Sequence, residues 1–478
     1  MSKAKTVFVS GHFNVLHPGH LRLLRFAKEC GGRLIVGVES DRVAGQAAHV
    51  KEQLRLESVR SIGWVDEAIL VNTSIMEVIQ SLKPDIVVKG KEHEAGINQE
   101  EALVSEYGGR LLFSSGDARF SSMDLIQREF QGVNNSTIIY PDIYLNRHEI
   151  NNNYLISLIN KFKNIRVCVL GDLIIDEYIT CQPLGMSRED PTIVVSPISS
   201  KQFLGGAGIV AAHAAAMGAT VNYLSVSGED VSRKYAIERL HQERVSAHIF
   251  VDDSRPTTLK QRFRSQGKTL LRVNNLHQDA VSVDLQKKIY SALSELIEHT
   301  DLIVFSDFNY GCLPQPLVER VIEVASKKNV MMVADSQSSS QLGDIARFKD
   351  MSLITPTEYE ARLSVRNSDA GLVVLAEDVR RQAKATNVFL KLGEEGLLIH
   401  AQGLNREHWL TDRLDALNTM PQDVAGAGDS MLIASALAIA SGGNIWAAAY
   451  LGSLAAAIQV GRIGNTPIRA EELIKELN

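Results

Sequence analysis

Two histidines with a glycine between them are the first residues in the chain whose spacing could support chemistry. The stretch GHFNVLHPGH, residues 11–20, follows the β-branched run TVFVS and contains His17, Gly19 and His20. Two imidazoles at this spacing could bind a metal, belong to an ordinary turn, or hold a triphosphate and stabilise the charge that develops as pyrophosphate leaves. Gly11 permits close approach of the backbone, and a helix beginning after the turn would present free N–H groups to a phosphate.

A second candidate is the stretch DVAGAGDS, residues 423–430, which precedes a long uncharged run. Its small residues Gly426, Ala427 and Gly428 predict a turn whose backbone N–H groups can hold a phosphate at the start of a helix. Asp429 would stand at that helix start, where a carboxylate can accept a proton from a sugar hydroxyl as the hydroxyl attacks a γ-phosphate. The alternative is an Asp that only caps the helix after a glycine-rich turn.

Length and charge limit the classes of protein to which the chain can belong. With 478 residues it exceeds what one hydrophobic core usually supports, so more than one domain is expected. A net charge of −6 gives no electrostatic reason to expect nucleic acid or an anionic membrane as a partner. Four scattered cysteines without a CxxC pair favour a reducing, cytoplasmic compartment and argue against a structural zinc site.

An uncharged run from residue 430 to residue 461 is long enough to span a bilayer. The sequence SGGN at 441–444 divides this run into two pieces rich in small residues. Two closely packed, buried helices are therefore expected here rather than a membrane span. The N-terminal residues lack the apolar region of a secretory signal.

Strand-like and helix-like stretches alternate along most of the chain. In the first part, the runs at 6–10, 33–38, 66–70, 85–90 and 110–115 are typical of strands separated by amphipathic stretches, which predicts a parallel sheet. A second α/β pattern begins at 165–172. The expected organisation is a Rossmann-like α/β domain at 1–135, an asparagine-rich linker at 136–163 that leads into a short helix, and a second α/β domain at 164–478.

The first domain resembles the HxGH nucleotidyltransferases, which include cytidylyltransferases and the adenylyltransferase half of bacterial ADP-heptose synthases. The stretch at 11–20 is similar to the family pattern GxFDxxHxGH, LKPDIVVKGKEHE at 82–94 to its PDxxVKG segment, and FSSMDLI at 120–126 to its late Ser/Thr motif. The resemblance implies a triphosphate clamp rather than a metal site. The residues that it implies are His17 and His20 for catalysis, and Gly11, Phe13, Asn14, Gly19, Lys89, Gly90, Ser121 and Ser122 for the nucleotide.

Two positions of this domain depart from the family pattern. Asn14 stands where the family usually has Asp, and Met123 stands where it usually has Ser or Thr. The family also carries a basic residue on the helix at VKEQLRLESVR, and the sequence leaves open whether Lys51 or Arg55 fills that role.

The second domain resembles the ribokinase-like, or pfkB, carbohydrate kinases. VLGDLIIDEY at 169–178 is similar to their opening strand, FLGGAGIVAAHAAAMGA at 203–219 to their Gly-Gly motif, and LITPTEYEA at 353–361 to their TPNxxE segment. The resemblance implies a ribokinase-like α/β fold with a small β lid and Asp429 as the catalytic base. The further residues that it implies are Asp172, Asp176, Gly205 and Gly206 for the sugar, Gly393, Gly396, Gly426, Ala427 and Gly428 for the nucleotide and its phosphates, and Asp335 and Glu360 for indirect binding of Mg²⁺.

Positive charges also alternate along LKQRFRSQGKTLLR, residues 259–272. Alternate residues of a strand share a face, so Lys260, Arg262, Arg264 and Arg272 are expected on one side of a strand pair. That face would suit the anionic group of a sugar phosphate, with Lys260 and Arg262 as sugar-phosphate ligands. The alternative is a solvated strand face, and Arg188 is a weaker contributor.

Four departures from the kinase pattern concern the sugar more than the phosphoryl group. Ile209 stands where the family usually has Asn, Ala425 where it has Thr, Thr357 where it has Asn, and ADSQ at 334–337 where it has DPK. The phosphoryl-transfer residues match, while the sugar specificity is open.

The two resemblances together imply a bifunctional enzyme of nucleotide-sugar biosynthesis. It would phosphorylate D-glycero-D-manno-heptose 7-phosphate with ATP and Mg²⁺ and transfer an adenylyl group to the sugar 1-phosphate, giving ADP-heptose. The alternatives are a kinase–cytidylyltransferase using CTP and another sugar or polyol phosphate, and a nucleotidyltransferase with a decayed, regulatory kinase-like half. In ADP-heptose synthases the kinase comes first, whereas here the transferase does. A homodimer through the kinase lid is also implied, with no nucleic acid or membrane as partner.

Overall fold

The computed structural model describes the chain in two compact units. The described residues are 5–478 except 15, 17, 46–47, 49, 91–97, 114–137, 188, 191, 266–267, 338–342 and 403–408. The first unit contains residues 1–135, 366–378 and 402–412, and the second contains residues 136–365, 379–401 and 413–478.

The first unit is built on a five-stranded sheet in the order β3-β2-β1-β4-β5, in which every neighbouring pair is parallel. The expected strands are confirmed, as β1 (Thr6–Gly11), β2 (Arg33–Glu39), β3 (Glu67–Val71), β4 (Ile86–Lys89) and β5 (Arg110–Phe113). The helices between them are α1 (Pro18–Glu29), α2 (Asp41–Ala44), α3 (Glu52–Arg60), α4 (Ile75–Leu82) and α5 (Gln99–Glu106). This strand order is that of a Rossmann-like fold, whose ligands bind beyond the carboxyl ends of the strands.

The second unit contains a nine-stranded sheet in the order β10-β9-β6-β13-β14-β15-β16-β17-β18. Its neighbours from β10 to β16 pair in parallel, and β17 runs antiparallel to β16. The strands are β6 (Arg166–Gly171), β9 (Thr220–Ser227), β10 (Ser246–Val251), β13 (Leu302–Asp307), β14 (Met331–Ser336), β15 (Leu353–Ile354), β16 (Asn387–Lys391), β17 (Leu397–Gln402) and β18 (Trp409–Leu414). The central strands are buried on both faces, as parallel strands covered by helices must be.

The helices of the second unit supply most of its core. They are α9 (Gly206–Ala216), α10 (Val231–Gln242), α11 (Val283–Leu296), α12 (Gln315–Lys327), α13 (Glu358–Val365), α15 (Ala427–Ala440), α16 (Ile445–Val460) and α17 (Ala470–Leu477), while the residues of α14 (Leu372–Ala383) are divided between the two units. The uncharged run after Ser430 forms α15 and α16, which are buried in one apolar core, so the expectation of two packed helices is confirmed. Among the described residues, none of the helices has the length and apolar character needed to cross a membrane.

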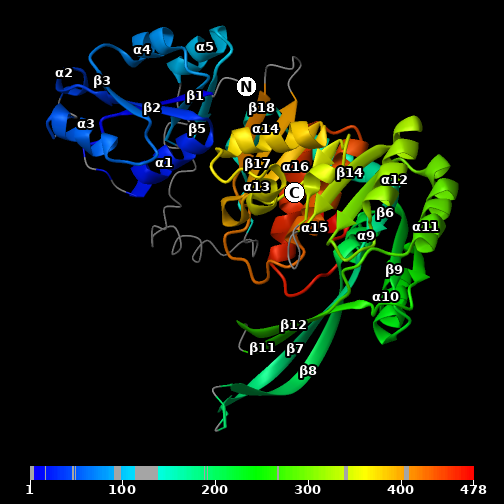
Figure 1. The fold of residues 1–478 in the computed structure, drawn as a ribbon. Helices are drawn as coiled ribbons and strands as arrows, with labels where there is room; N and C mark the ends of the chain where they lie inside the picture. Colours follow the sequence, from blue (N-terminus) through cyan, green and yellow to red (C-terminus); the bar gives the residue numbers. More distant parts are fainter. Residues whose placement is uncertain are drawn as a thin grey trace. The chain divides into compact units, whose positions relative to one another are not determined.

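A separate four-stranded sheet extends from one end of the second unit (Figure 1). Its order is β12-β11-β7-β8, with β7 (Leu173–Met186), β8 (Ile193–Gly205), β11 (Thr258–Ser265) and β12 (Lys268–Asn275). The long strand β7 follows β6 directly, and β8 leads straight into α9. This sheet is the expected β lid, and its roots meet the carboxyl end of β6.

The segment expected as a linker contains two helices of the second unit. They are α7 (Asp142–Arg147) and α8 (Asn152–Lys161), which bury Tyr144, Leu145, Leu155 and Leu158 in the core of that unit. The hydroxyl of Tyr144 donates a hydrogen bond of 2.9 Å to the Trp446 carbonyl. The helix predicted near the end of the segment is present. Its apolar residues pack in the core of the second unit, so this part of the segment is not a free linker.

Candidate active sites

The first candidate site lies where β1 ends and α1 begins. Gly11 is the last residue of β1, and Phe13 has a left-handed φ of 48° and a side chain only 3% exposed. The Phe13 ring lies 5.1 Å from the imidazole of His20 between ring centres, on the first turn of α1. The Phe13 ring therefore packs beside His20 at the end of the sheet where such folds bind ligands.

A buried arginine holds the loop that follows β1. Arg55 on α3 is 1% exposed and donates to the carbonyls of Val50 (2.7 Å), His12 (2.6 Å) and Glu39 (2.8 Å), and to the Asp41 carboxylate (2.6 Å). The sequence left open whether Lys51 or Arg55 is the basic residue expected on this helix. Arg55 contacts the loop, and its hydrogen bonds support the backbone there.

Asn14 also has a structural partner. Its Oδ1 accepts a hydrogen bond of 3.3 Å from the backbone N–H of Val50. An amide oxygen fulfils this acceptor role as well as a carboxylate, so the Asn in place of Asp is compatible with an ordered loop.

The remaining predicted residues of this unit fall into two groups. Lys89 ends β4 and forms an ion pair of 2.8 Å with Glu100, and Gly90 follows it. The backbone of Gly19 lies in the first turn of α1. His17, Ser121 and Ser122 lie outside the described residues.

The second candidate site is centred on Asp429, in the first turn of α15. The helix begins directly after Gly426, whose φ of 76° is a left-handed value that suits glycine, and continues through Ala427 and Gly428. The Asp429 carboxylate is 6% exposed and accepts a hydrogen bond of 3.2 Å from the Gln337 amide. Burial and the charge of Asp335 raise the pKa of Asp429 to about 7.

Asp335 and Glu360, the two residues predicted near Mg²⁺, are both buried in this unit. The Asp335 carboxylate accepts hydrogen bonds from Thr355 (2.9 Å) and Lys391 (2.9 Å). Glu360 accepts from the backbone N–H of Thr357 (2.8 Å), whose hydroxyl in turn accepts from the Glu360 N–H (3.2 Å). This reciprocal pair is a capping box at the start of α13, which explains how a Thr replaces the usual Asn there.

Asp176 on β7 meets a basic partner from β11 in the lid. Its carboxylate pairs with the Arg262 guanidinium, and it lies 3.5 Å from the Asn465 amide nitrogen. A β-carbon on Gly205 would lie 2.4 Å from Asp176 Oδ2, and one on Gly206 would lie 2.5 Å from the Asp172 carbonyl. The Gly-Gly motif is therefore required for the close approach of the backbone to these strands.

Asp172 serves the loop after β13. Its two carboxylate oxygens accept hydrogen bonds from the backbone N–H groups of Phe308 (2.8 Å), Tyr310 (3.3 Å) and Cys312 (3.2 Å). Burial and the charge of Asp307 raise the pKa of Asp172 to about 6. Backbone donors contact both carboxylate oxygens, which still have acceptor sites left, so the sugar-binding role expected of Asp172 stays a prediction.

The same loop fixes Lys260, the residue predicted to bind the anionic group of the sugar. The Lys260 ammonium lies 5.0 Å from the ring centres of both Phe308 and Tyr310, within the range of cation–π attraction. Lys260 is also among the positive charges that act on Asp429, so the basic face of β11 and the start of α15 lie within electrostatic range of each other.

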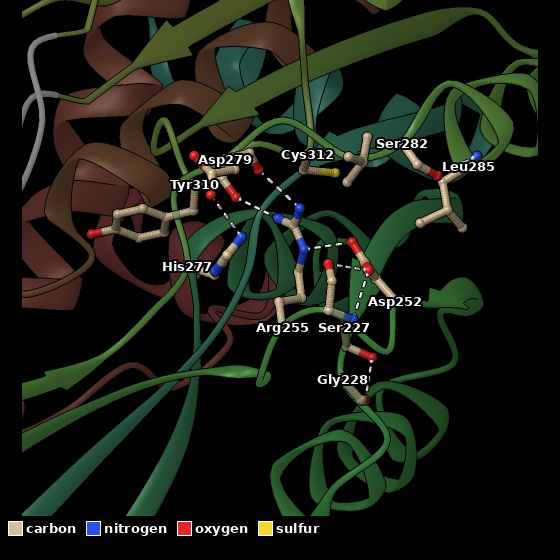
Figure 2. Close-up of polar contacts among 12 residues, drawn as sticks. Ser227, Gly228, Asp252, Arg255, His277, Asp279, Ser282, Leu285, Tyr310 and Cys312 are labelled. Atoms are coloured by element: carbon tan, nitrogen blue, oxygen red, sulfur yellow. Dashed lines mark hydrogen bonds and ion pairs between the residues drawn. The ribbon is translucent and has the colours of Figure 1, made fainter.

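A buried arginine that the sequence did not single out ties this loop in place (Figure 2). Arg255 pairs with Asp252 at 2.6 Å and donates to the carbonyls of Tyr310 (2.8 Å) and Asp279 (2.9 Å). It thus joins three segments that are remote in sequence. The motif RPTTLK places Arg255 five residues before Lys260, but only the fold reveals its partners.

The other predicted kinase residues lie at turns and in the core. Gly393 begins the short helix between β16 and β17 and Gly396 directly follows it, with φ values of 63° and 88°. Arg264 lies 3.9 Å from Asp423. Ile209 is fully buried in α9 and contributes no polar atom to the site. Arg188 lies outside the described residues.

This fold and this site define a carbohydrate kinase of the ribokinase type. The description "pfkB family carbohydrate kinase" belongs to a family model that matches residues 164–471, and a model described as "cytidylyltransferase-like" matches residues 8–115. The chain belongs to the pfkB family of carbohydrate kinases and carries a cytidylyltransferase-like domain in front of the kinase domain.

Curated relatives carry the name "Bifunctional protein HldE". The protein of a Nitratiruptor species is 29% identical over 315 residues, covering 64% of this chain and 64% of that protein. The protein of Helicobacter acinonychis is 27% identical over 324 residues, covering 66% of each. The match spans slightly less than two thirds of these relatives' own length.

Solved structures confirm the fold of the second unit. Phosphofructokinase-2 from Escherichia coli, in complex with substrates and products, superposes with a TM-score of 0.54 at 16% identity over 66% of this chain and 98% of its own. Ribokinase from Arabidopsis thaliana, with ribose and ATP, gives 0.52 at 17% identity with the same coverage. The expected Rossmann-like and ribokinase-like architectures are both observed.

Proposed function

We propose that the second unit phosphorylates a sugar phosphate and that Asp429 is the base. The observation that carries the proposal is the buried Asp429 carboxylate at the start of α15, whose pKa of about 7 suits a group that accepts a proton near neutral pH. The sugar hydroxyl attacks the γ-phosphorus of ATP, its proton passes to Asp429, and ADP leaves. Gly426, Ala427 and Gly428 hold the phosphates through their backbone N–H groups.

The sugar phosphate is held from the lid. Asp176 accepts hydrogen bonds from sugar hydroxyls and is itself oriented by Arg262. Lys260, steadied over two aromatic rings, binds the remote phosphate group. Asp172 positions the loop that carries those rings.

Mg²⁺ fits the donor set of this site. Asp335 and Glu360 offer carboxylate oxygens, the ligand type that Mg²⁺ prefers, and would hold the ion through its water shell. When bound, the ion supplies neutralisation of phosphate charge.

The first unit, in this proposal, transfers a nucleotidyl group. An acceptor phosphate attacks the α-phosphorus of a nucleoside triphosphate that His17, His20 and Lys89 hold, and pyrophosphate leaves. Position and charge neutralisation suffice for this reaction, since it needs no covalent intermediate.

The substrates proposed are D-glycero-D-manno-heptose 7-phosphate for the kinase and the heptose 1-phosphate with ATP for the transferase, giving ADP-heptose. The motif resemblance to ADP-heptose synthases supports them. The deciding assay incubates the full chain with ATP, Mg²⁺ and each sugar phosphate separately and identifies products by mass spectrometry. Absence of a bisphosphate and of ADP-heptose would reject this assignment.

CTP is the second candidate nucleotide for the first unit, favoured by the cytidylyltransferase-like match at residues 8–115. Incubation of the full chain with the sugar 1-phosphate and either ATP or CTP, with the products identified by mass spectrometry, separates the two. Formation of the cytidine diphosphate sugar alone would replace the adenylyl assignment.

A homodimer through the lid is also part of the proposal. Leu184, Met186, Ile193, Ile198 and Leu271 on the lid strands are each more than half exposed. Such a collection of exposed apolar side chains on one small sheet is typical of an interface, and a second copy of the same lid is the partner we propose.

A further inference from the structure

A lysine lies buried among the carboxylates of the second unit. Lys391, the last residue of β16, has a side chain 12% exposed, and its Nζ lies 2.9 Å from Asp335 Oδ1. Its ammonium forms an ion pair with the Asp335 carboxylate, and it interacts electrostatically with Glu360 and Asp429 as well.

The same ammonium reaches the phosphate-binding turn. A β-carbon built on Gly428 would lie 3.3 Å from Lys391 Nζ. An ammonium has three N–H donors, and Asp335 takes one of them. Lys391 thus stands between an acid and the turn at the start of α15.

The carboxylates near this turn would repel an anionic ligand. Asp335, Glu360 and Asp429 are 1%, 7% and 6% exposed, so water screens their charges weakly. Gln337, which links Asp335 and Asp429 by hydrogen bonds of 3.4 Å and 3.2 Å, is neutral. Lys391 supplies positive charge on the side of the cluster that faces Gly428.

We propose that Lys391 binds the phosphate groups of the nucleotide at the Gly428 turn. In the free protein its ammonium neutralises Asp335, and with nucleotide bound its other donors contact phosphate oxygens. The catalytic consequence rests on the proposed kinase function, whereas the binding contact does not.

The test compares Lys391→Met with Lys391→Arg in the full chain. ATP affinity is measured by calorimetry with Mg²⁺ and again with EDTA, in a Lys89→Met background that weakens the site of the first unit. We expect K391M to bind ATP about tenfold or more weakly under both conditions, and kcat/KM for phosphorylation to fall on the order of 10²-fold. K391R, which keeps the positive charge, should restore part of the ATP affinity and part of kcat/KM. Lys328→Met, at an exposed lysine of the same unit, is the matched control.

Each outcome decides one of the two proposals. Unchanged ATP affinity in a folded K391M protein overturns the role of Lys391, even if the wild type phosphorylates sugars. If the wild type phosphorylates no sugar, the proposed function fails, and the ATP titrations still decide on Lys391. Should K391M fail to fold, Asp335→Asn/Lys391→Met removes the unpaired buried acid; its ATP affinity compared with that of Asp335→Asn alone then settles the contact.

Discussion

At the scale of single residues, Asp429 is the group whose surroundings determine its chemistry. It is buried next to another acid, and its pKa is raised to about 7 for that reason. Because a proton acceptor must be ionised, its carboxylate is active above that value and inactive below it.

The pH dependence of phosphorylation follows directly. We expect kcat/KM to fall as pH decreases through about 7, approaching a tenfold loss per pH unit, because protonated Asp429 cannot accept the hydroxyl proton. The profile is measured from about pH 5.5 to about pH 9 with ADP release as the signal, a range that brackets the pKa of the proposed base. A flat profile across the acidic half of that range would exclude Asp429 as the base.

The sequence identified some site residues through local pattern and missed others that depend on long-range packing. Asp429 follows a glycine-rich turn, and Lys260 and Arg262 alternate on a strand, so both patterns are visible in the chain. Lys391 stands two residues before Gly393 in the sequence, but the acids around it come from β14, α13 and α15, which no local pattern brings together. The sequence likewise shows no sign of the three backbone donors to Asp172, because they lie on residues remote from it in the chain.

At the scale of elements, the loop after β13 is held from two sides. Asp172 accepts hydrogen bonds from its N–H groups, and Arg255 donates to the Tyr310 carbonyl (Figure 2). Together they place two aromatic rings beside the Lys260 ammonium. The β-branched runs in the sequence predicted the strands. The contacts of Asp172 and Arg255 with this loop, a clamp that joins four separate segments, have no local sequence pattern that could predict them.

Loosening that clamp should affect the sugar more than the nucleotide. Arg255→Lys keeps the charge but loses the planar fork, so we expect KM for the sugar phosphate to rise about tenfold while KM for ATP stays within about twofold. Steady-state kinetics with each substrate varied in turn measure this. Arg320→Lys, on the exposed surface of α12, is the control, and equal changes in both KM values would contradict a role in sugar binding.

The lid sheet makes a prediction about assembly. Ile198→Lys and Leu271→Lys replace apolar side chains that are 65% and 56% exposed with charged ones. Because the proposed interface would bury these charges, each substitution should shift the protein from dimer to monomer. Sedimentation velocity reports the change. Val283→Lys, equally exposed at 64% on α11, should leave the dimer intact. A monomeric wild type would reject the lid interface.

At the scale of the whole molecule, two separate sheets carry two separate sites. Within the described residues, Gly11 ends a strand of the five-stranded sheet and His20 lies on the helix that follows it. Asp429 belongs to the unit that contains the nine-stranded sheet. The alternation of strands and helices predicted both sheets, and the motifs predicted their order along the chain.

The two activities should therefore be separable by single substitutions. Asp429→Asn is expected to lower phosphorylation by about 10³-fold and leave nucleotidyl transfer unchanged, because only the kinase loses its base. Lys89→Met should do the reverse. Both reactions are followed in parallel by mass spectrometry of the products. Loss of both activities in either variant would indicate coupled rather than independent sites.

Helices α7 and α8 have a practical consequence for dissecting the protein. A kinase fragment cut at residue 164, where the family match begins, would leave behind Tyr144, Leu155 and Leu158, each at most 5% exposed, and uncover the surfaces of the core that they fill. A fragment beginning at residue 138 retains both helices. We expect the shorter piece to aggregate and the longer one to melt cooperatively, so the place of excision decides whether the kinase half can be handled alone.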